Sequence, residues 1–522
     1  MRLIAGAARC ARDDVPGPSQ GTTVEAGASG GELRRRSLLS AAVGGVGALM
    51  VGCGGGSTAD AMASAARGPS PLRAAAVSAG AGGRLPSLGG MFLQAAIYEG
   101  WRAGAPFDPW HTLASNGVQW ARTVVTTRSC PELDSVPVAQ WRTLGWKDEF
   151  WSCREMGAAV LRRAAAAGMK LQLGLYLSDG AANAGSQKRP AMWAGVADAD
   201  LPSRVEAHAR DLAGYYRSAG LDIEVFEIGN ETDFGFFGYN LGDNIPVPPG
   251  VDPVNTPSWM EENLWSKFVP IFTAAIRGLR SVYPTASIAL HVAGFGYSRG
   301  NVAPRGFFDA MTRAGVPYDI AGFSYPYITA GARPLPEPYF AQADFLDTID
   351  AVRATGKRVR IIEFSYPAAT GGVDPSLGAY PCTEAGQAAF LHDFVQAVAG
   401  RVENINYWAA DIFTGINGPG GLPPDIESFG LFGSDATPRE VVGALRRAAA
   451  DRLFDWAQEQ YPALFPSPAS SANFEQYYYR YYPASQTYLA LEEASKAIVV
   501  DNGRDLQRAT VGLLGDYARM TA

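Results

Sequence analysis

The chain has 522 residues, of which 47% are hydrophobic and 11% aromatic, so it can bury a large core and is not a disordered polymer. Its formal net charge is −7 and its body has no long basic run, which argues against nucleic acid as the main partner. A neutral substrate, or one that is not selected by charge, fits this balance.

The first 53 residues predict an N-terminal extension followed by an export signal. Three arginines at 34–36 precede a short apolar run and a small-residue site, which is the order found in signal peptides. The run Arg35-Arg36-Ser37-Leu38-Leu39 resembles the twin-arginine export motif. Met50-Val51-Gly52-Cys53 resembles a bacterial lipobox, which predicts a lipid anchor at Cys53; plain cleavage nearby is the alternative. We therefore expect an exported protein that is periplasmic, an outer-membrane lipoprotein or extracellular.

Residues 54–87 are rich in glycine, alanine and serine and predict a flexible linker. From 88 to 449, segments typical of strands and helices then alternate. The predicted strands are Met91–Ala96, Val118–Thr126, Lys170–Leu177, Ile223–Ile228, Ser287–Val292, Tyr318–Ser324, Arg358–Glu363 and Asn404–Ala409. The predicted helices are Glu149–Ala167, Pro202–Ala219, Ser258–Val282, Arg305–Ala314, Tyr339–Thr355 and Glu384–Ala399.

This alternation predicts the α/β fold class and a (β/α)₈ TIM barrel. A doubly wound open sheet is the structural alternative, but no glycine-rich phosphate turn follows the first strand. Residues 450–522 predict a small C-terminal accessory domain, with a short amphipathic helix and aromatic strands. Attachment to carbohydrate or to the cell surface and a simple packing role both fit that domain.

The chain has five cysteines, Cys10, Cys53, Cys130, Cys153 and Cys382, without zinc-ribbon or Cys-x-x-Cys spacing. Cys130 and Cys153 are candidates for a disulfide in an oxidising compartment; two unpaired thiols are the alternative, and Cys382 is left over. The segment Asp243–Asp252 has acids among prolines and is interpreted as a loop, not as a calcium site. We expect no metal and no cofactor.

Two glutamates each follow an apolar, β-rich run, namely Glu231 after Asp222–Asn230 and Glu363 after Lys357–Ile362. The runs are the fourth and seventh predicted strands, whose ends lie across the mouth of a barrel. Two carboxylates at one face are what hydrolysis of a glycosidic bond requires. A salt-bridged carboxylate at a strand end explains either glutamate alone, but the pair together favours a catalytic function.

Five segments in the same order resemble glycoside hydrolase family 53, the endo-β-1,4-galactanases. The resemblance covers roughly residues 88–448. Its segments are Leu175–Trp193 after the third strand, Phe226–Thr232 at the acid/base, Tyr318–Tyr327 at the sixth strand, Ile361–Pro367 at the nucleophile and Asn406–Trp408 near the eighth strand.

The resemblance implies a retaining enzyme with Glu231 as general acid/base and Glu363 as nucleophile. Glu231 must then stay protonated near neutral pH, which burial or the charge of Glu363 would favour by raising its pKa. Glu363 must be ionised, and Arg122 on the second strand is the candidate cation. A barrel-rim salt bridge is the alternative for Arg122.

Further candidate substrate-binding residues surround this pair. Asn230 is expected to contact the sugar 2-hydroxyl, and Trp408 to lie under a sugar ring, with a core tryptophan as the alternative. Tyr325 is either a hydrogen-bond donor to Glu363 or a packed rim tyrosine. Asp179 and Tyr176 belong to the segment after the third strand, which faces substrate in the family.

This chain departs from the family pattern in that segment, with Tyr176 in place of a histidine, Ala181 in place of a tryptophan and Asn183 in place of a second aspartate. The resemblance implies a polysaccharide substrate of the β-galactan kind, and these departures leave two alternatives. One is a related β-glycanase of other sugar specificity. The other is a catalytically silent barrel that binds polysaccharide, against which the retention of both glutamates speaks.

Overall fold

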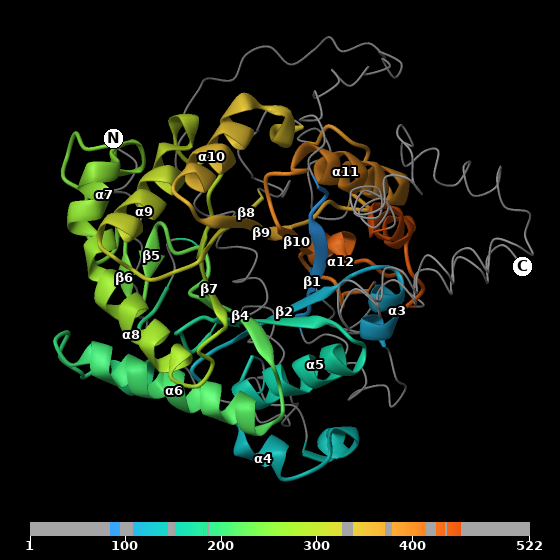
Figure 1. The fold of residues 1–522 in the computed structure, drawn as a ribbon, viewed down its shortest axis with the longest axis horizontal. Helices are drawn as coiled ribbons and strands as arrows, with labels where there is room; N and C mark the ends of the chain where they lie inside the picture. Colours follow the sequence, from blue (N-terminus) through green and yellow to red (C-terminus); the bar gives the residue numbers. More distant parts are fainter. Residues whose placement is uncertain are drawn as a thin grey trace, which may run out of the picture.

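The molecule is built around a closed barrel of eight parallel strands in the order β1-β10-β9-β8-β7-β4-β3-β2 (Figure 1). The computed structural model describes residues 84–93, 108–144, 150, 152–180, 182, 184, 187–325, 338–370, 378–413, 424–433 and 436–449. The strands are β1 (Ser87–Met91), β2 (Trp120–Val125), β3 (Lys170–Leu175), β4 (Ile223–Ile228), β7 (Ser287–Val292), β8 (Ile320–Ser324), β9 (Arg358–Phe364) and β10 (Asn404–Tyr407). Closure of the sheet confirms the predicted TIM barrel and excludes the open, doubly wound alternative.

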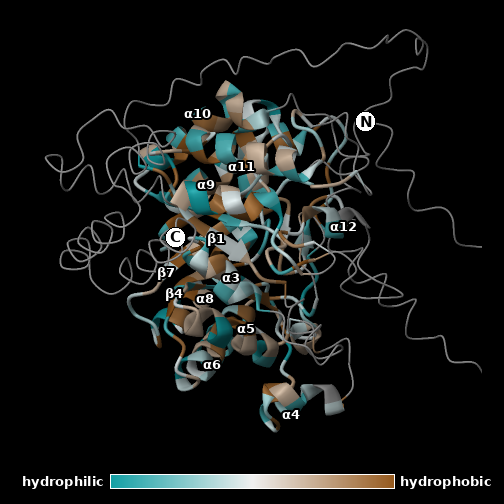
Figure 2. Ribbon diagram, turned by 90° about the vertical axis from the view of Figure 1, so that its right-hand side faces the viewer, coloured by the Kyte–Doolittle hydropathy of each residue, from teal (hydrophilic) through white to brown (hydrophobic). Residues whose placement is uncertain are grey.

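Helices surround the barrel, as Figure 1 shows. They are α3 (Pro109–Ser115), α4 (Pro131–Asp134), α5 (Arg154–Ala166), α6 (Leu201–Ser218), α7 (Pro257–Asn263), α8 (Val269–Arg280), α9 (Val302–Arg313), α10 (Ala343–Ala354), α11 (Glu384–Ala397) and α12 (Pro424–Phe429). In α6 the buried residues Leu201, Val205, Ala209 and Leu212 recur at helical spacing, so one stripe of the helix faces the core. Figure 2 shows the same mixture of hydrophilic and hydrophobic positions along α9 and α10.

Shorter elements lie in the connections between strands and helices. The 3₁₀ turns are η1 (Val138–Leu144), η3 (Ala191–Trp193), η4 (Pro253–Asn255), η5 (Trp265–Lys267), η6 (Arg299–Asn301) and η7 (Tyr339–Ala341). A small antiparallel pair, β5 (Gly235–Phe236) and β6 (Tyr239–Asn240), follows β4 directly. The β5–β6 pair therefore lies on the side of the barrel where β4 has its carboxyl end.

The first strand begins earlier than predicted, because pairing with β10 and β2 starts by Ser87 and Gly89, whereas the prediction starts at Met91. The two glycines in this strand obscured it, since glycine is depleted in strands. The structure gives the reason for one of them. A Cβ on Gly89 would come within 1.9 Å of the Asn406 side-chain oxygen, so only glycine lets β1 close against β10.

The single helix predicted over Ser258–Val282 is wrong, because the chain forms α7, η5 and α8 there. Pro270 lies in the first turn of α8, where its missing N–H costs nothing, and it could not continue a helix from α7. Likewise, the predicted helix Tyr339–Thr355 is divided into η7 and α10.

A column of polar side chains occupies the barrel interior. From the amino-terminal end upward, Arg360 donates to Gln172 at 3.1 Å, and Gln172 donates to Glu227 at 3.1 Å. The Arg360 guanidinium also lies 4.1 Å from the centre of the Trp120 ring, a cation–π contact that supports its burial. Charged and hydrogen-bonded side chains thus line the barrel axis up to the mouth, where the predicted site lies.

Several predictions fall on residues outside the described ranges. These are the N-terminal extension and signal, Cys53, the linker up to residue 83 and the accessory domain at 450–522, all of which stay predictions. Ser87, the last residue of the predicted linker, belongs to β1. Within the described ranges, none of the helices has both the length and the apolar character needed to span a bilayer.

Candidate active site

Arg122 is the centre of the site. Its side chain is fully buried and donates from Nε and Nη2 to the two carboxylate oxygens of Glu227, both at 2.7 Å. Its Nη1 donates to Glu363 at 2.7 Å, and its Nη2 also reaches the Asn230 side-chain oxygen at 3.1 Å. Burial alone would lower the pKa of Arg122, but the charges of Glu227 and Glu363 outweigh it and raise the pKa. The predicted cation beside Glu363 is therefore in place and permanently charged.

Glu363 faces the interior because strand β9 is irregular. The register of β8 against β9 shifts by one residue, from Phe323 opposite Ile361 to Ser324 opposite Glu363. In a regular strand side chains alternate, so Arg360 and Glu363, three positions apart, would point to opposite faces. A bulge between them turns both side chains inward, a common device next to functional sites.

Glu231 lies beyond the end of β4 in a buried position with only 4% of its surface exposed. Burial and the nearby charge of Glu363 raise its pKa from 4.5 to about 7, although His291, the Ala184 amide and the Ser324 hydroxyl favour the ionised form. The Ala184 N–H donates to its carboxylate at 3.2 Å. This carboxyl group can hold a proton near neutral pH, as expected from the sequence.

The backbone of Glu231 has φ of 50°, a left-handed conformation that is uncommon for a residue with a side chain. Two hydrogen bonds hold the turn, from Thr232 N–H to the His291 carbonyl at 2.8 Å and from Gln187 Nε2 to the Asn230 carbonyl. The preceding Gly229 has φ of 76°, and a Cβ there would lie 2.3 Å from Thr232. The local sequence Gly-Asn-Glu-Thr thus aims the Glu231 carboxyl group through a strained turn.

Two buried residues that contact Arg122 or Ser324, namely Glu227 and His291, were not predicted from the sequence as part of the site. Glu227 accepts from both Arg122 and Gln172, and His291 Nδ1 lies 2.9 Å from its Oε1. His291 Nε2 is 2.9 Å from the Ser324 hydroxyl, which itself reaches Glu231. A buried glutamate inside an apolar strand, and one of only four histidines of the chain, were the available signals.

Glu227 and Glu231 share one short segment but differ in ionisation. Burial opposes the charge of Glu227, but Arg122 and His291 lower its pKa to about 2. The pKa of Glu231 is raised to about 7. One carboxylate is therefore fixed in the ionised form as a structural anchor, and the other can exchange a proton.

Asn230 and Asp179 are held by local hydrogen bonds. The Asn230 side chain spans from Arg122 Nη2 to the Ala182 carbonyl, which accepts from its Nδ2 at 2.8 Å. Both oxygens of Asp179 are engaged, one by the Thr127 hydroxyl and one by the Ala191 N–H at 2.6 Å. Asp179 thus ties the segment after β3 to the loop after β2, in addition to any contact with substrate.

Tyr176 and Trp408 lie together at the mouth. Tyr176 is buried in a small cluster with Met91, Val124 and Ala182, against which the half-buried Trp408 packs. Burial and the charge of Glu363 raise the pKa of the Tyr176 hydroxyl, so it is a neutral donor near that carboxylate. Trp408 is thus partly exposed and packs against the cluster of Tyr176, an environment compatible with the predicted sugar platform.

The contacts of Tyr325 that the structure describes are those of a packed tyrosine at the barrel rim. Its ring packs against Phe345 of α10 and against Phe390 and Phe394 of α11, and its hydroxyl accepts from the Phe340 N–H at 3.3 Å. Its neighbour Ser324 points into the barrel toward His291, so alternation turns Tyr325 outward. The packed rim tyrosine, left open by the sequence, is the interpretation that these contacts favour. Its backbone N–H still donates to the Glu363 carbonyl at 2.7 Å.

Fold and site together define a TIM-barrel protein with a pair of interior carboxylates at the carboxyl ends of its strands. Residues 101–461 match the family model described as Glycosyl hydrolase family 53, and the chain belongs to this family.

Relatives and solved structures agree with this membership. An endo-beta-1,4-galactanase of Bacillus subtilis is 25% identical over a match that covers 47% of this chain and 52% of that protein. A probable arabinogalactan endo-beta-1,4-galactanase A of Aspergillus terreus is 24% identical over 48% of this chain and 67% of that protein. The chain thus matches only about half of the length of the Bacillus relative. The Ignisphaera aggregans GH53 catalytic domain has the same fold, with a TM-score of 0.53 and 20% identity over 69% of this chain and 95% of that chain.

Proposed function

We propose that this protein is a retaining glycoside hydrolase that cleaves the β-1,4-galactan backbone of galactan or arabinogalactan side chains. Membership of family 53 and the names of the matched relatives support this substrate class. The observation that carries the proposal is the pairing of Glu231, which can hold a proton near neutral pH, with Glu363, which Arg122 keeps beside a permanent positive charge. No cofactor is needed for this chemistry.

In the first step, an oxygen of Glu363 attacks the anomeric carbon while Glu231 gives its proton to the departing glycosidic oxygen. The electron pair of the broken C–O bond leaves with that oxygen, and a covalent glycosyl-enzyme forms. In this intermediate Glu363 is an uncharged ester. The charge that raised the pKa of Glu231 is then gone, so its pKa falls and the ionised Glu231 can act as a base.

In the second step, Glu231 takes a proton from a water molecule, whose oxygen attacks the same carbon and releases Glu363. Two displacements on one carbon retain the anomeric configuration. We expect Asn230, whose side-chain oxygen accepts from Arg122, to bond the sugar 2-hydroxyl, and Trp408 to stack under a sugar ring. Tyr176 beside Trp408 replaces the usual histidine of the family, so this subsite is where specificity is most open to change.

The decisive experiment compares Glu231→Gln and Glu363→Gln on two substrates, with anomeric configuration followed by NMR. On β-1,4-galactan both variants should lose at least about a thousandfold in kcat. On an aryl galactoside with a good leaving group, which needs no proton, Glu231→Gln should still release the aryl group in a first turnover, whereas Glu363→Gln should not. Glu224→Gln, at the opposite end of β4 and paired with Lys170, is the matched control and should retain activity.

Initial formation of the inverted anomer, or unchanged turnover in both variants, would reject the mechanism. Measuring cleavage of β-1,4-galactan, arabinogalactan, mannan and xylan identifies the sugar specificity. Cleavage of mannan or xylan in place of galactan would favour the related β-glycanase. Binding of one polymer without cleavage of any would favour a silent binding barrel.

We also propose that the protein is exported and carries a lipid on Cys53. The arginine cluster, the short apolar run and the sequence Met50–Cys53 support this. Metabolic labelling with a palmitate analogue should mark the wild type but not Cys53→Ala, and both should leave the cytoplasm. Equal labelling of the two proteins would contradict the anchor, and retention of the wild type in the cytoplasm would contradict export.

A further inference from the structure

The chain makes a long excursion between β2 and α5, from Thr126 to Cys153, and its two ends meet at the barrel mouth. The Thr126 N–H and hydroxyl donate to the Ser152 carbonyl at 2.7 and 3.0 Å. The Arg154 N–H donates to the Arg128 carbonyl at 3.1 Å. Helix α4 and turn η1 lie within this excursion, so these hydrogen bonds close its base.

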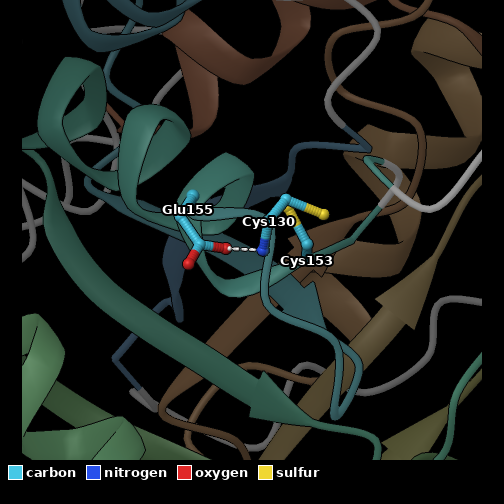
Figure 3. A group of neighbouring side chains, drawn as sticks. All are labelled: Cys130, Cys153 and Glu155. Carbon is cyan, nitrogen blue, oxygen red and sulfur yellow. Dashed lines mark hydrogen bonds between the residues drawn. The ribbon is translucent and has the colours of Figure 1, made fainter. Parts of the chain in front are cut away.

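Two cysteine thiols meet at the same base. Cys130 precedes α4 and Cys153 precedes α5, and both side chains are buried. Their sulfur atoms and a carboxylate oxygen of Glu155 all lie within 4.8 Å of one another (Figure 3). Both cysteines are in the reduced form in this structure.

A metal ion is a poorer explanation for the cluster than a redox pair. Glu155 Oε1 already accepts from the Ser129 hydroxyl and from Arg154 Nε, both at 2.7 Å. Its Oε2 accepts from the Cys130 N–H at 2.7 Å, the bond drawn in Figure 3. Glu155 is thus engaged in holding the loop. Among the described residues of this cluster, that leaves two thiols, fewer ligands than a structural zinc site uses.

We propose that Cys130 and Cys153 form a disulfide bond that closes the excursion at its base. The reaction is thiol–disulfide exchange with a disulfide donor, such as oxidised glutathione or a dithiol oxidase of an oxidising compartment. The two thiols lose two protons and two electrons as the sulfur–sulfur bond forms, and the donor disulfide is reduced to two thiols. The sulfur atoms lie within 4.8 Å of each other, and closure brings them to about 2.0 Å.

The bond would act on a loop that reaches the site. The Thr127 hydroxyl, three residues before Cys130, donates to Asp179, whose second oxygen holds the segment after β3. The bond closes a loop of about 24 residues, which reduces the conformational freedom of the unfolded chain. We therefore expect a gain in stability, not a change in the chemical step.

The test uses the full chain, unfolded and refolded in a mixture of oxidised and reduced glutathione. Free thiols are alkylated at acid pH and the cysteine peptides identified by mass spectrometry. We expect a peptide pair linked through Cys130 and Cys153, alkylated Cys382, and a Tm about 5 °C above that of the same protein in dithiothreitol. Cys382→Ser should keep this difference, whereas the double variant Cys130→Ser, Cys153→Ser should lose it.

Alkylation of both Cys130 and Cys153 after oxidative refolding would overturn the proposal, as would linkage of either one to Cys382. If one zinc ion per chain binds and protects both thiols from alkylation, the cluster is a metal site and not a disulfide. The peptide map is made on the wild type, so it decides the question even if a serine variant does not fold.

Discussion

Replacing Glu231 by glutamine should stabilise the protein at alkaline pH. Burial and the charge of Glu363 raise the pKa of Glu231 from 4.5 to about 7. The folded state therefore binds this proton more tightly than the unfolded state does. The stability that Glu231 contributes is fully present below pH about 4.5 and is lost as the pH rises through about 7.

The size of the effect follows from the shift. At 1.36 kcal/mol for each pKa unit, the shift corresponds to about 3 kcal/mol of lost stability above pH 7. Glutamine resembles the protonated carboxyl group in shape and keeps an acceptor for the Ala184 N–H, so it does not undergo this loss. Asp233, whose pKa burial raises to about 6, is present in both proteins and cancels in the comparison.

Urea unfolding followed by tryptophan fluorescence at pH 4.5, 6 and 8 measures this difference. The free energies of unfolding of wild type and Glu231→Gln should be similar at pH 4.5 and differ by about 3 kcal/mol in favour of the variant at pH 8. Glu224→Gln, on the same strand but 38% exposed at its side chain, should follow the wild type across the range. A constant difference between wild type and Glu231→Gln at all three pH values would refute the buried, charge-coupled position of Glu231.

Four further predictions address the remaining groups of the site. The kcat/KM on galactan should fall about tenfold per pH unit above pH 7, as Glu231 loses its proton; a profile that stays flat to pH 9 would contradict its role as acid. Arg122→Lys should lower the free energy of unfolding by about 3 kcal/mol and kcat by more than about a hundredfold, because an ammonium group cannot make the forked contact to Glu227 and still reach Glu363. Glu227→Gln should cost a similar amount of stability in urea, since it leaves Arg122 with one buried charge partner; a loss below about 1 kcal/mol would mean that Glu227 is not the anchor. Trp408→Ala should raise KM for the polymer about tenfold with little change in kcat, and an equal fall of kcat would argue against a platform role.

The residues at strand ends were the part of the site that the sequence predicted best. The bounds of β4 and β7 agree with the predicted Ile223–Ile228 and Ser287–Val292, so the position of Glu231 after β4 followed correctly. Arg122 followed from the need for a cation beside an ionised Glu363 and from its place on the second predicted strand. The strand β1 was misplaced because its glycines are required by close contact with β10, which only the closed barrel reveals.

A single sequence does not determine to which face of a strand each side chain points. The sequence leaves Tyr325 open between a donor to Glu363 and a packed rim tyrosine, and the alternation of side chains at Ser324 favours the second. The bulge in β9 that turns Glu363 inward has no local sequence signature. The contact between Glu227 and Arg122 likewise depends on the register of β2, β3 and β4. The register determines which interior side chains lie at the same height along the barrel axis.

The opposite ionisation of two glutamates four residues apart is the strongest internal argument for catalysis. Glu227 and Glu231 are both buried, so burial alone would raise both pKa values. Arg122 and His291 compensate the charge of Glu227, whereas Glu231 faces the charge of Glu363 and only weaker compensation. A purely structural barrel would gain stability by giving Glu231 a cation or replacing it by an apolar residue. The strained turn at Glu231 and its only partly compensated carboxyl group lower stability, and the proposed acid/base role would account for both.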